Sequence, residues 1–343
     1  MNALVQRTDR LDTTAQPAKA AGRCIATGNT ARPDRTTIMA SLLSHPAFSD
    51  ARKAIIANLT QLFRGDYLLS RLLLEEGRYL TIQTLLHLAA GQQAEERATW
   101  LTLGRLQARL AGSELASRNR IEALVAILER YSFLERRKAE EDLRVTLLLP
   151  TPRLWGSDAV LAEAMAQPLA LFRDLRDPGP ALCSLMARNR ISGSAFAGPH
   201  DTGPGFDPQA PAWSNRDLAT AGAGHRAWHR ALSPHIDTYF ALRAAHPQVQ
   251  GLAARDGGYL TFLLLLGEVE QTGSARLCLP FETLSSHTGV SRTHARLLME
   301  LAEASGFIKL HAKGGRDIEV LPALHQAGDA WFADHMAFFL TLD

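Results

Sequence analysis

Apolar residues recur along most of this chain with the period of an α-helix. The clearest example follows Ser291, which is a favourable N-cap, and ends before Gly306, which is a favourable helix stop. Between them the apolar positions follow the i, i+3, i+4, i+7 spacing of one helix face: Ala295, Leu298, Met299 and Ala302. We therefore predict a helix from residue 291 to about residue 305.

The segments around this helix complete a short ordered pattern. A helix is predicted from Pro280, a residue favoured in the first turn, and a tight turn follows at 288–290 around Gly289. After the capped helix, residues 307–311 and 316–321 are predicted strands joined around Gly314 and Gly315, which indicates a β-hairpin. A last helix is predicted at about 323–340.

The first half of the chain predicts the same order. A helix at 103–110 and a turn at 111–116 precede Ser117, the predicted cap of a second helix. The buried face of that helix has matching spacing: Ile121, Leu124, Val125 and Leu128. Strands at 134–138 and 143–149 and a helix at about 158–175 follow. Long helical segments are predicted before each pattern, at about 47–90 and 226–270.

Three pairs of segments align between the two halves in the same order. Gly77-Arg-Tyr-Leu-Thr aligns with Gly257-Gly-Tyr-Leu-Thr, and Ser117-Arg aligns with Ser291-Arg. Phe133 then aligns with Phe307. The alternative is chance similarity between Leu-rich helices, but the common order favours an internal repeat.

Two segments lack apolar periodicity. Residues 1–39 are rich in Thr, Ala, Arg and Pro and are predicted to be disordered, either as an extension before a translation start at Met39 or as a basic arm on DNA. Residues 188–225 are rich in Gly and Pro and are predicted to be a linker. The predicted domains are therefore 40–187 and 226–343.

The order of helix, tight turn, capped helix and hairpin is that of a winged helix-turn-helix. Each half resembles the winged-helix domain of MarR-type transcription regulators, most clearly over residues 284–308. The resemblance implies a mainly α fold with small β-hairpin wings, present here as two winged helix-turn-helix domains in tandem. MarR-type proteins usually carry one such domain per chain and dimerise, so one chain here could act as a pseudo-dimer or form a homodimer. The resemblance also suggests a small-molecule effector, which no residue identifies.

The second helix of this motif enters the major groove and presents its N-terminal residues to base edges. Arginine can bind guanine with two hydrogen bonds, asparagine can bind adenine, and hydroxyl groups suit phosphate oxygens. The candidate DNA-binding residues, including two at the second hairpin, are Arg118, Asn119, Arg120, Ser291, Arg292, Thr293, His294, Arg296, Lys313 and Arg316. The alternative for each is an ordinary solvated polar side chain.

Composition limits the other classes of function. The net charge is only +2, so a basic surface must be local. No apolar run reaches the ~18 residues of a membrane span, and three distant cysteines suggest neither a disulfide framework nor a zinc site, so a cytoplasmic location is expected. His225 and His229 have metal-ligand spacing, with His235 and Asp237 nearby, but surface helix histidines are commoner. We therefore assign no metal or cofactor. No catalytic residue is assigned, because the sequence contains no phosphate-binding loop, no Gly-x-Ser-x-Gly and no His-Glu-x-x-His motif.

The resulting prediction is a sequence-specific double-stranded DNA-binding protein that regulates transcription. One alternative is a plasmid-type replication initiator, because some initiators also resemble two fused winged helices. Another is a winged-helix scaffold that binds proteins, although such a scaffold needs no arginine at the start of both capped helices.

Overall fold

Most described residues are helical. The computed structural model describes residues 34–65, 68, 72–111, 116–177, 179–186 and 225–342. Residues 1–33 of the predicted disordered segment (1–39) and residues 188–224 of the predicted linker (188–225) lie outside them. Among the described residues, none of the helices is both long and apolar enough to span a membrane.

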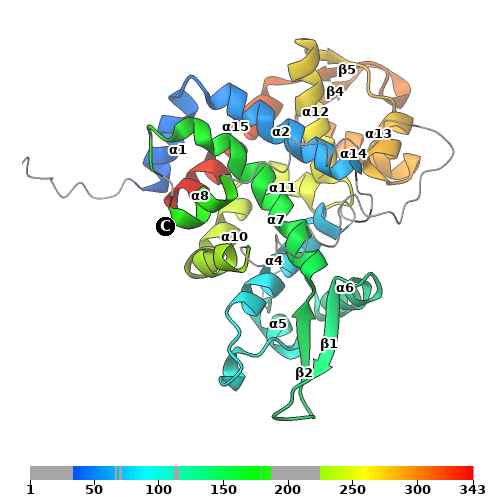
Figure 1. The fold of residues 1–343 in the computed structure, drawn as a ribbon. Coiled ribbons are helices and arrows are strands. Elements are labelled where there is room, and N and C mark those ends of the chain that lie inside the picture. Colours follow the sequence, from blue (N-terminus) through cyan, green and yellow to red (C-terminus); the bar gives the residue numbers. More distant parts are fainter. Residues whose placement is uncertain are drawn as a thin grey trace, which may run out of the picture. The chain divides into compact units, whose positions relative to one another are not determined.

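The first half contains a two-stranded sheet among helices (Figure 1). Its helices are α1 (Arg35–Ser44), α2 (Phe48–Gly65), α4 (Glu76–Ala90), α5 (Leu103–Arg109), α6 (Arg118–Arg130), α7 (Pro152–Ala166) and α8 (Pro180–Met186), with 3-10 helices η1 (Arg97–Thr99) and η2 (Gln167–Phe172). The strands are β1 (Leu134–Lys138) and β2 (Thr146–Pro150), paired antiparallel with Leu134 opposite Pro150.

The second half contains a three-stranded sheet in the order β3-β5-β4. Residues 225–232 form its first described helix. The other helices are η3 (Ser233–His235), α10 (Ile236–Ala244), α11 (Pro247–Ala253), α12 (Gly258–Thr272), α13 (Phe281–Thr288), α14 (Arg292–Ala304), η4 (Lys313–Gly315) and α15 (Pro322–Thr341). The strands are β3 (Arg276–Leu277), β4 (Ile308–Leu310) and β5 (Ile318–Val320), with β5 antiparallel to both neighbours.

Both halves contain a short helix, a capped helix and an antiparallel hairpin in that order. We call residues 103–150 the first hairpin unit and residues 281–320 the second. The predicted stripes are buried in both capped helices, α6 and α14. After each helix the chain turns at a left-handed residue, Ser132 (φ 58°) or Gly306 (φ 74°). The next amide then donates to a helix carbonyl, from Phe133 to Leu128 (2.8 Å) and from Phe307 to Ala302 (3.0 Å).

The aligned Gly-x-Tyr-Leu-Thr segments also begin equivalent helices. Thr81 at the start of α4 donates its hydroxyl hydrogen to the Gly77 carbonyl (2.6 Å), and Thr261 of α12 donates to the Gly257 carbonyl (2.8 Å). The run from Leu260 to Leu266 in α12 is buried throughout. The aligned segments thus lie at helix starts in both halves, although Gly77 lies inside α4 whereas Gly257 is the left-handed N-cap of α12 (φ 72°).

Several predicted helix boundaries were wrong. The helical chain begins at Arg35 rather than after Met39, because Asp34 caps α1 by accepting from the Thr37 amide (2.7 Å). The predicted helix at 47–90 is divided into α2 and α4, and that at 226–270 is divided by Pro234, by Pro247 and before Gly258. The helix after β2 begins at Pro152 and continues as a 3-10 helix from Gln167, because Pro168 has no amide hydrogen to donate.

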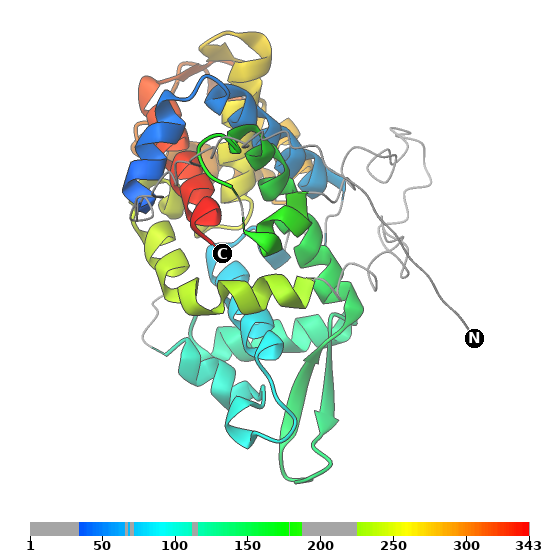
Figure 2. The same ribbon diagram turned by 60° about the vertical axis from the view of Figure 1, so that its left-hand side comes forward.

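The two halves share one hydrophobic core. Helix α1 packs against α15, while α2 packs against both α12 and α7. In both views the hairpin of β1 and β2 lies at one end of this helical body and β4 and β5 lie near the other (Figure 1, Figure 2). The N-terminal helices of the first half are thus part of the packing that supports the second hairpin unit.

Candidate functional site

The predicted DNA-binding residues at the capped helices lie at exposed helix starts. Ser117 accepts from the Arg120 amide (3.4 Å), and Ser291 accepts from the His294 amide (3.2 Å). The exposed side chains at these two starts are Arg118, Asn119 and Arg120 of the first unit and Ser291, Arg292 and Thr293 of the second. His294 is only partly exposed, because its Nε2 donates to the Asp256 carbonyl (3.0 Å).

The two helix starts differ in how their arginines are paired. Arg292 forms an ion pair with Glu282 of α13, and both side chains are 71% exposed. Arg296 pairs with Glu300 one turn later on α14 (3.4 Å). Within the described residues, Arg118 and Arg120 form no ion pair. Exposed ion pairs contribute only about 0–1 kcal/mol, so a stronger anionic partner can displace the carboxylates.

The two hairpins also differ at their ends. Lys313 and Arg316 are exposed at the glycine-containing turn of the second hairpin. At Gly315 (φ 75°) a Cβ would lie 2.3 Å from the Leu279 carbonyl oxygen, so the close approach of the turn requires glycine. The first hairpin instead exposes acidic residues at its tip, Glu140 and Glu141, beside basic residues of β1. Both surfaces mix charges: the turn of the first hairpin carries Glu140, Glu141 and Asp142 with Arg144, whereas the turn of the second carries Lys313 and Arg316.

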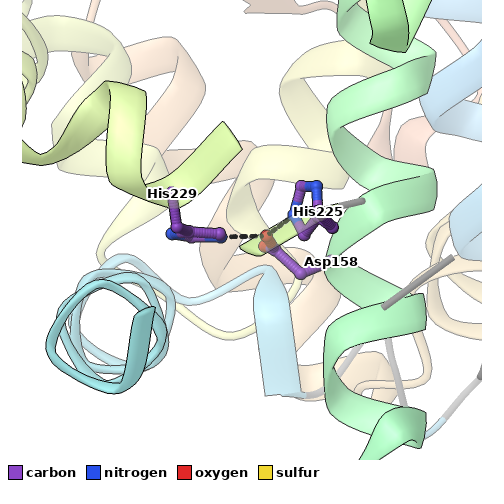
Figure 3. A group of neighbouring side chains, drawn as sticks. All are labelled: Asp158, His225 and His229. Carbon is purple, nitrogen blue, oxygen red and sulfur yellow. Dashed lines mark hydrogen bonds and ion pairs between the residues drawn. The ribbon is translucent and has the colours of Figure 1, made fainter. Parts of the chain in front are cut away.

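A different group of residues gathers in the interior (Figure 3). Asp158 projects from α7 towards His225 and His229, which lie one turn apart on the helix at 225–232. The Nε2 atoms of His225 and His229 lie 2.5 Å and 2.8 Å from Oδ2 of Asp158. The other carboxylate oxygen, Oδ1, accepts from the Gln83 side-chain amide (2.5 Å). We call Asp158, His225 and His229 the buried triad.

The sequence did not reveal this triad. His225 and His229 were expected on the surface, but both are 0% exposed, and Asp158 is also buried. The residues considered with them lie elsewhere: Asp237 is exposed and pairs with Arg109, and His235 is outside the group. The i, i+4 spacing of the histidines was a usable signal, whereas Asp158 is far away in sequence and could not be found from spacing.

Electrostatics at the triad favours an ionised carboxylate. Burial opposes ionisation of Asp158, but hydrogen bonds from His225 and His229 outweigh it and lower the pKa of that carboxyl group. The indole of Trp155 meets the two imidazoles edge-on, with ring centroids 5.5 Å from His229 and 6.5 Å from His225. A buried anion is therefore held between two imidazoles with fixed orientations.

A cavity lies next to the triad, and Asp158, a member of the triad, is one of the residues that line it. The volume of this cavity is about 60 Å³. Its wall contains an ion pair in which Arg243 Nε donates to Oε1 of Glu76 (2.7 Å), and both side chains are at least nine-tenths buried. The hydroxyl groups of Tyr79 and Tyr239 lie 2.7 Å apart in the same wall, and burial raises the pKa of Tyr259 to about 12.

Comparisons with family models, with curated proteins and with solved structures find no match to this chain.

Proposed function

We propose that this chain is a sequence-specific double-stranded DNA-binding protein that regulates transcription in the cytoplasm, with two winged helix-turn-helix units of the MarR-like kind. One observation carries the proposal. In both hairpin units a serine-capped helix exposes arginine in its first turn and is followed directly by an antiparallel hairpin.

Physical chemistry supports DNA as the partner of these helix starts. The first turn of a helix carries unpaired amide hydrogens and a partial positive charge, both of which favour a phosphate. Arg118 and Arg292 occupy the first position of α6 and α14, where a side chain of a recognition helix reaches base edges. Lys313 and Arg316 would contact the neighbouring DNA backbone.

Two units in one chain suggest how a DNA site is occupied. We propose that one chain places α6 and α14 in successive major grooves, about 34 Å apart along the duplex. The chain would then act as a pseudo-dimer, whereas a homodimer would occupy a longer site with four recognition helices. Counting chains per bound duplex at saturation, by mass measurement of the complex, distinguishes these assemblies.

The decisive experiment is selection of bound sequences from a random duplex pool with the full chain, at a stated salt concentration. We expect a specific motif with two half-sites. Arg292→Ala should weaken binding to that motif, while Arg173→Ala, which removes an exposed arginine outside both hairpin units, should leave it unchanged.

Other outcomes of the selection favour the alternatives. Absence of any duplex binding would contradict the proposal and favour a protein-binding scaffold. Enrichment of tandem repeated sites bound by several chains would favour a replication initiator.

A further inference from the structure

We infer that the buried triad of Asp158, His225 and His229 binds a divalent first-row transition-metal ion, with zinc as the expected metal. This site is independent of the proposed DNA binding. The inference begins with geometry, because one ligand atom from each residue converges on a common point, all three within 4.8 Å of one another (Figure 3).

The donor atoms match this class of metal. Two imidazole nitrogens and one carboxylate oxygen suit zinc, iron, cobalt or nickel, whereas calcium and magnesium prefer sets made of oxygen atoms. The i, i+4 spacing of His225 and His229 directs both rings to the same side of one helix. The carboxylate completes a three-residue set of the size found in catalytic zinc sites, which keep a fourth position for water or another small ligand.

Neighbouring residues hold the three ligand side chains in place, as they do in known metal sites. Metal-binding carboxylates are usually hydrogen-bonded by a second residue, and Gln83 performs this role for Oδ1 of Asp158. Trp155 restricts both rings, and all three side chains are at most 4% exposed. A divalent ion bound by these residues would place a positive charge beside the buried carboxylate of Asp158, which is already ionised.

The triad needs only a small adjustment to admit an ion. Ligand atoms at about 2.1 Å from a tetrahedral metal lie about 3.4 Å from one another. The present contacts of 2.5 Å and 2.8 Å would therefore lengthen by less than about 1 Å, and the two histidine ligand atoms, now within 4.8 Å of one another, would take the same separation. The bound ion would join α7 of the first half to the helix at 225–232 of the second.

The test uses the full chain, stripped of metal with a chelator and then titrated with Zn²⁺ in competition with a chromophoric chelator. We expect one Zn²⁺ per chain. Asp158→Asn and His229→Gln should each weaken zinc affinity by more than about 100-fold, and Gln83→Leu by about 10–100-fold, the usual effect of losing a second residue behind a ligand. The matched control is His235→Gln, a partly exposed histidine outside the triad, which should bind zinc like the wild type.

A measurement on the wild type alone keeps the inference testable if a variant fails to fold. X-ray absorption of the zinc-loaded protein should show only nitrogen and oxygen ligands, with scattering from two imidazoles. Failure of the wild type to bind one equivalent of Zn²⁺, a sulfur ligand in the spectrum, or unchanged affinity in folded Asp158→Asn and His229→Gln would each overturn it. None of these readouts involves DNA, so the metal site and the proposed function can fail separately.

Discussion

The two hairpin units have the same backbone pattern and different surroundings. Both capped helices have 13 residues, buried stripes at matching positions and a left-handed turn before the hairpin. By contrast, the helix preceding each unit begins differently. Glu76 before Gly77 is buried against Arg243, whereas the matching Asp256 before Gly257 is partly exposed and pairs with Arg78 (2.7 Å). The comparison shows that backbone geometry recurs while charge and burial are set separately in each half.

The largest expected effect is a difference in the free energy of unfolding between variants that break these two ion pairs. Arg243→Met should lower the free energy of unfolding by about 3–5 kcal/mol, because it leaves the Glu76 carboxylate buried without a counter-charge. Arg78→Met removes a partly exposed pair and should lower it by at most about 1 kcal/mol. Urea denaturation of both variants measures the difference. The double variant Glu76→Gln with Arg243→Met should recover much of the loss, and equal effects of the two single variants would contradict the distinction.

The second comparison tests the proposed DNA-binding surfaces. Arg292→Ala should weaken specific binding about tenfold or more, which is about 1.4 kcal/mol or more and lies within the range of one bidentate base contact. Arg118→Ala should have a smaller effect, because Glu122 lies where the second unit has Arg296 and its hairpin tip is acidic. Glu282→Gln should strengthen binding, since it releases Arg292 from its ion pair. Titrations on the selected site at one salt concentration measure all three, and a larger loss for Arg118→Ala would reverse the proposed asymmetry.

The third comparison concerns the turn after each capped helix. Gly306→Ala should lower the free energy of unfolding by about 1–2 kcal/mol from left-handed strain alone, because a Cβ there would meet no atom within 4 Å. Ser132 already adopts this conformation with a side chain, so Ser132→Gly should change stability by less and in the opposite direction. Thermal unfolding of the two variants provides the check, and a stabilising Gly306→Ala would show that the turn is not strained.

The smallest expected effect is a pH dependence. His335 of α15 matches Met165 of α7 when Pro322 is aligned with Pro152, and both residues line the cavity. Burial lowers the pKa of His335 well below 6.5, and the nearby positive charges of Arg243, His246 and Arg35 lower it further. The hydrogen bond from His335 to the Trp331 carbonyl raises the pKa but does not outweigh these effects. The unfolded chain therefore takes up a proton that the folded chain does not, so stability falls as pH decreases below about 6.5.

Replacing His335 by methionine, the residue at the matching position 165, should remove this dependence of stability on pH. Between pH 6.5 and 5.5 the loss of unfolding free energy should be about 1 kcal/mol smaller in His335→Met than in the wild type. Urea denaturation at the two pH values measures the loss. The control His235→Met changes a partly exposed histidine and should keep the wild-type dependence, while an unchanged dependence in His335→Met would show that His335 remains protonatable in the fold.

Local signals that act over a few residues predict part of the fold correctly. Ser117 and Ser291 were placed as helix caps, and the buried faces of α6 and α14 followed from spacing alone, because a helix period and a cap depend on neighbouring residues. The sequence also predicts the β1–β2 hairpin, although its second strand begins at Thr146 rather than at residue 143. The long helical segments were less well predicted, because apolar periodicity continues across breaks such as those at Pro234 and Pro247.

The sequence by itself determined the mainly helical character, the two hairpins and the repeated order of elements. Only the tertiary structure decided which polar residues meet. Asp158 reaches His225 and His229, and Glu76 reaches Arg243, across long separations in the chain. Nothing in local spacing specifies such pairs, because they depend on how helices of the two halves pack. The second half has no residue equivalent to Asp158. When Pro322 of α15 is aligned with Pro152 of α7, the position that matches Asp158 is Gly328. A Cβ added at Gly328 would lie 3.0 Å from the Leu266 side chain, so the packing there leaves little room for a metal-binding side chain.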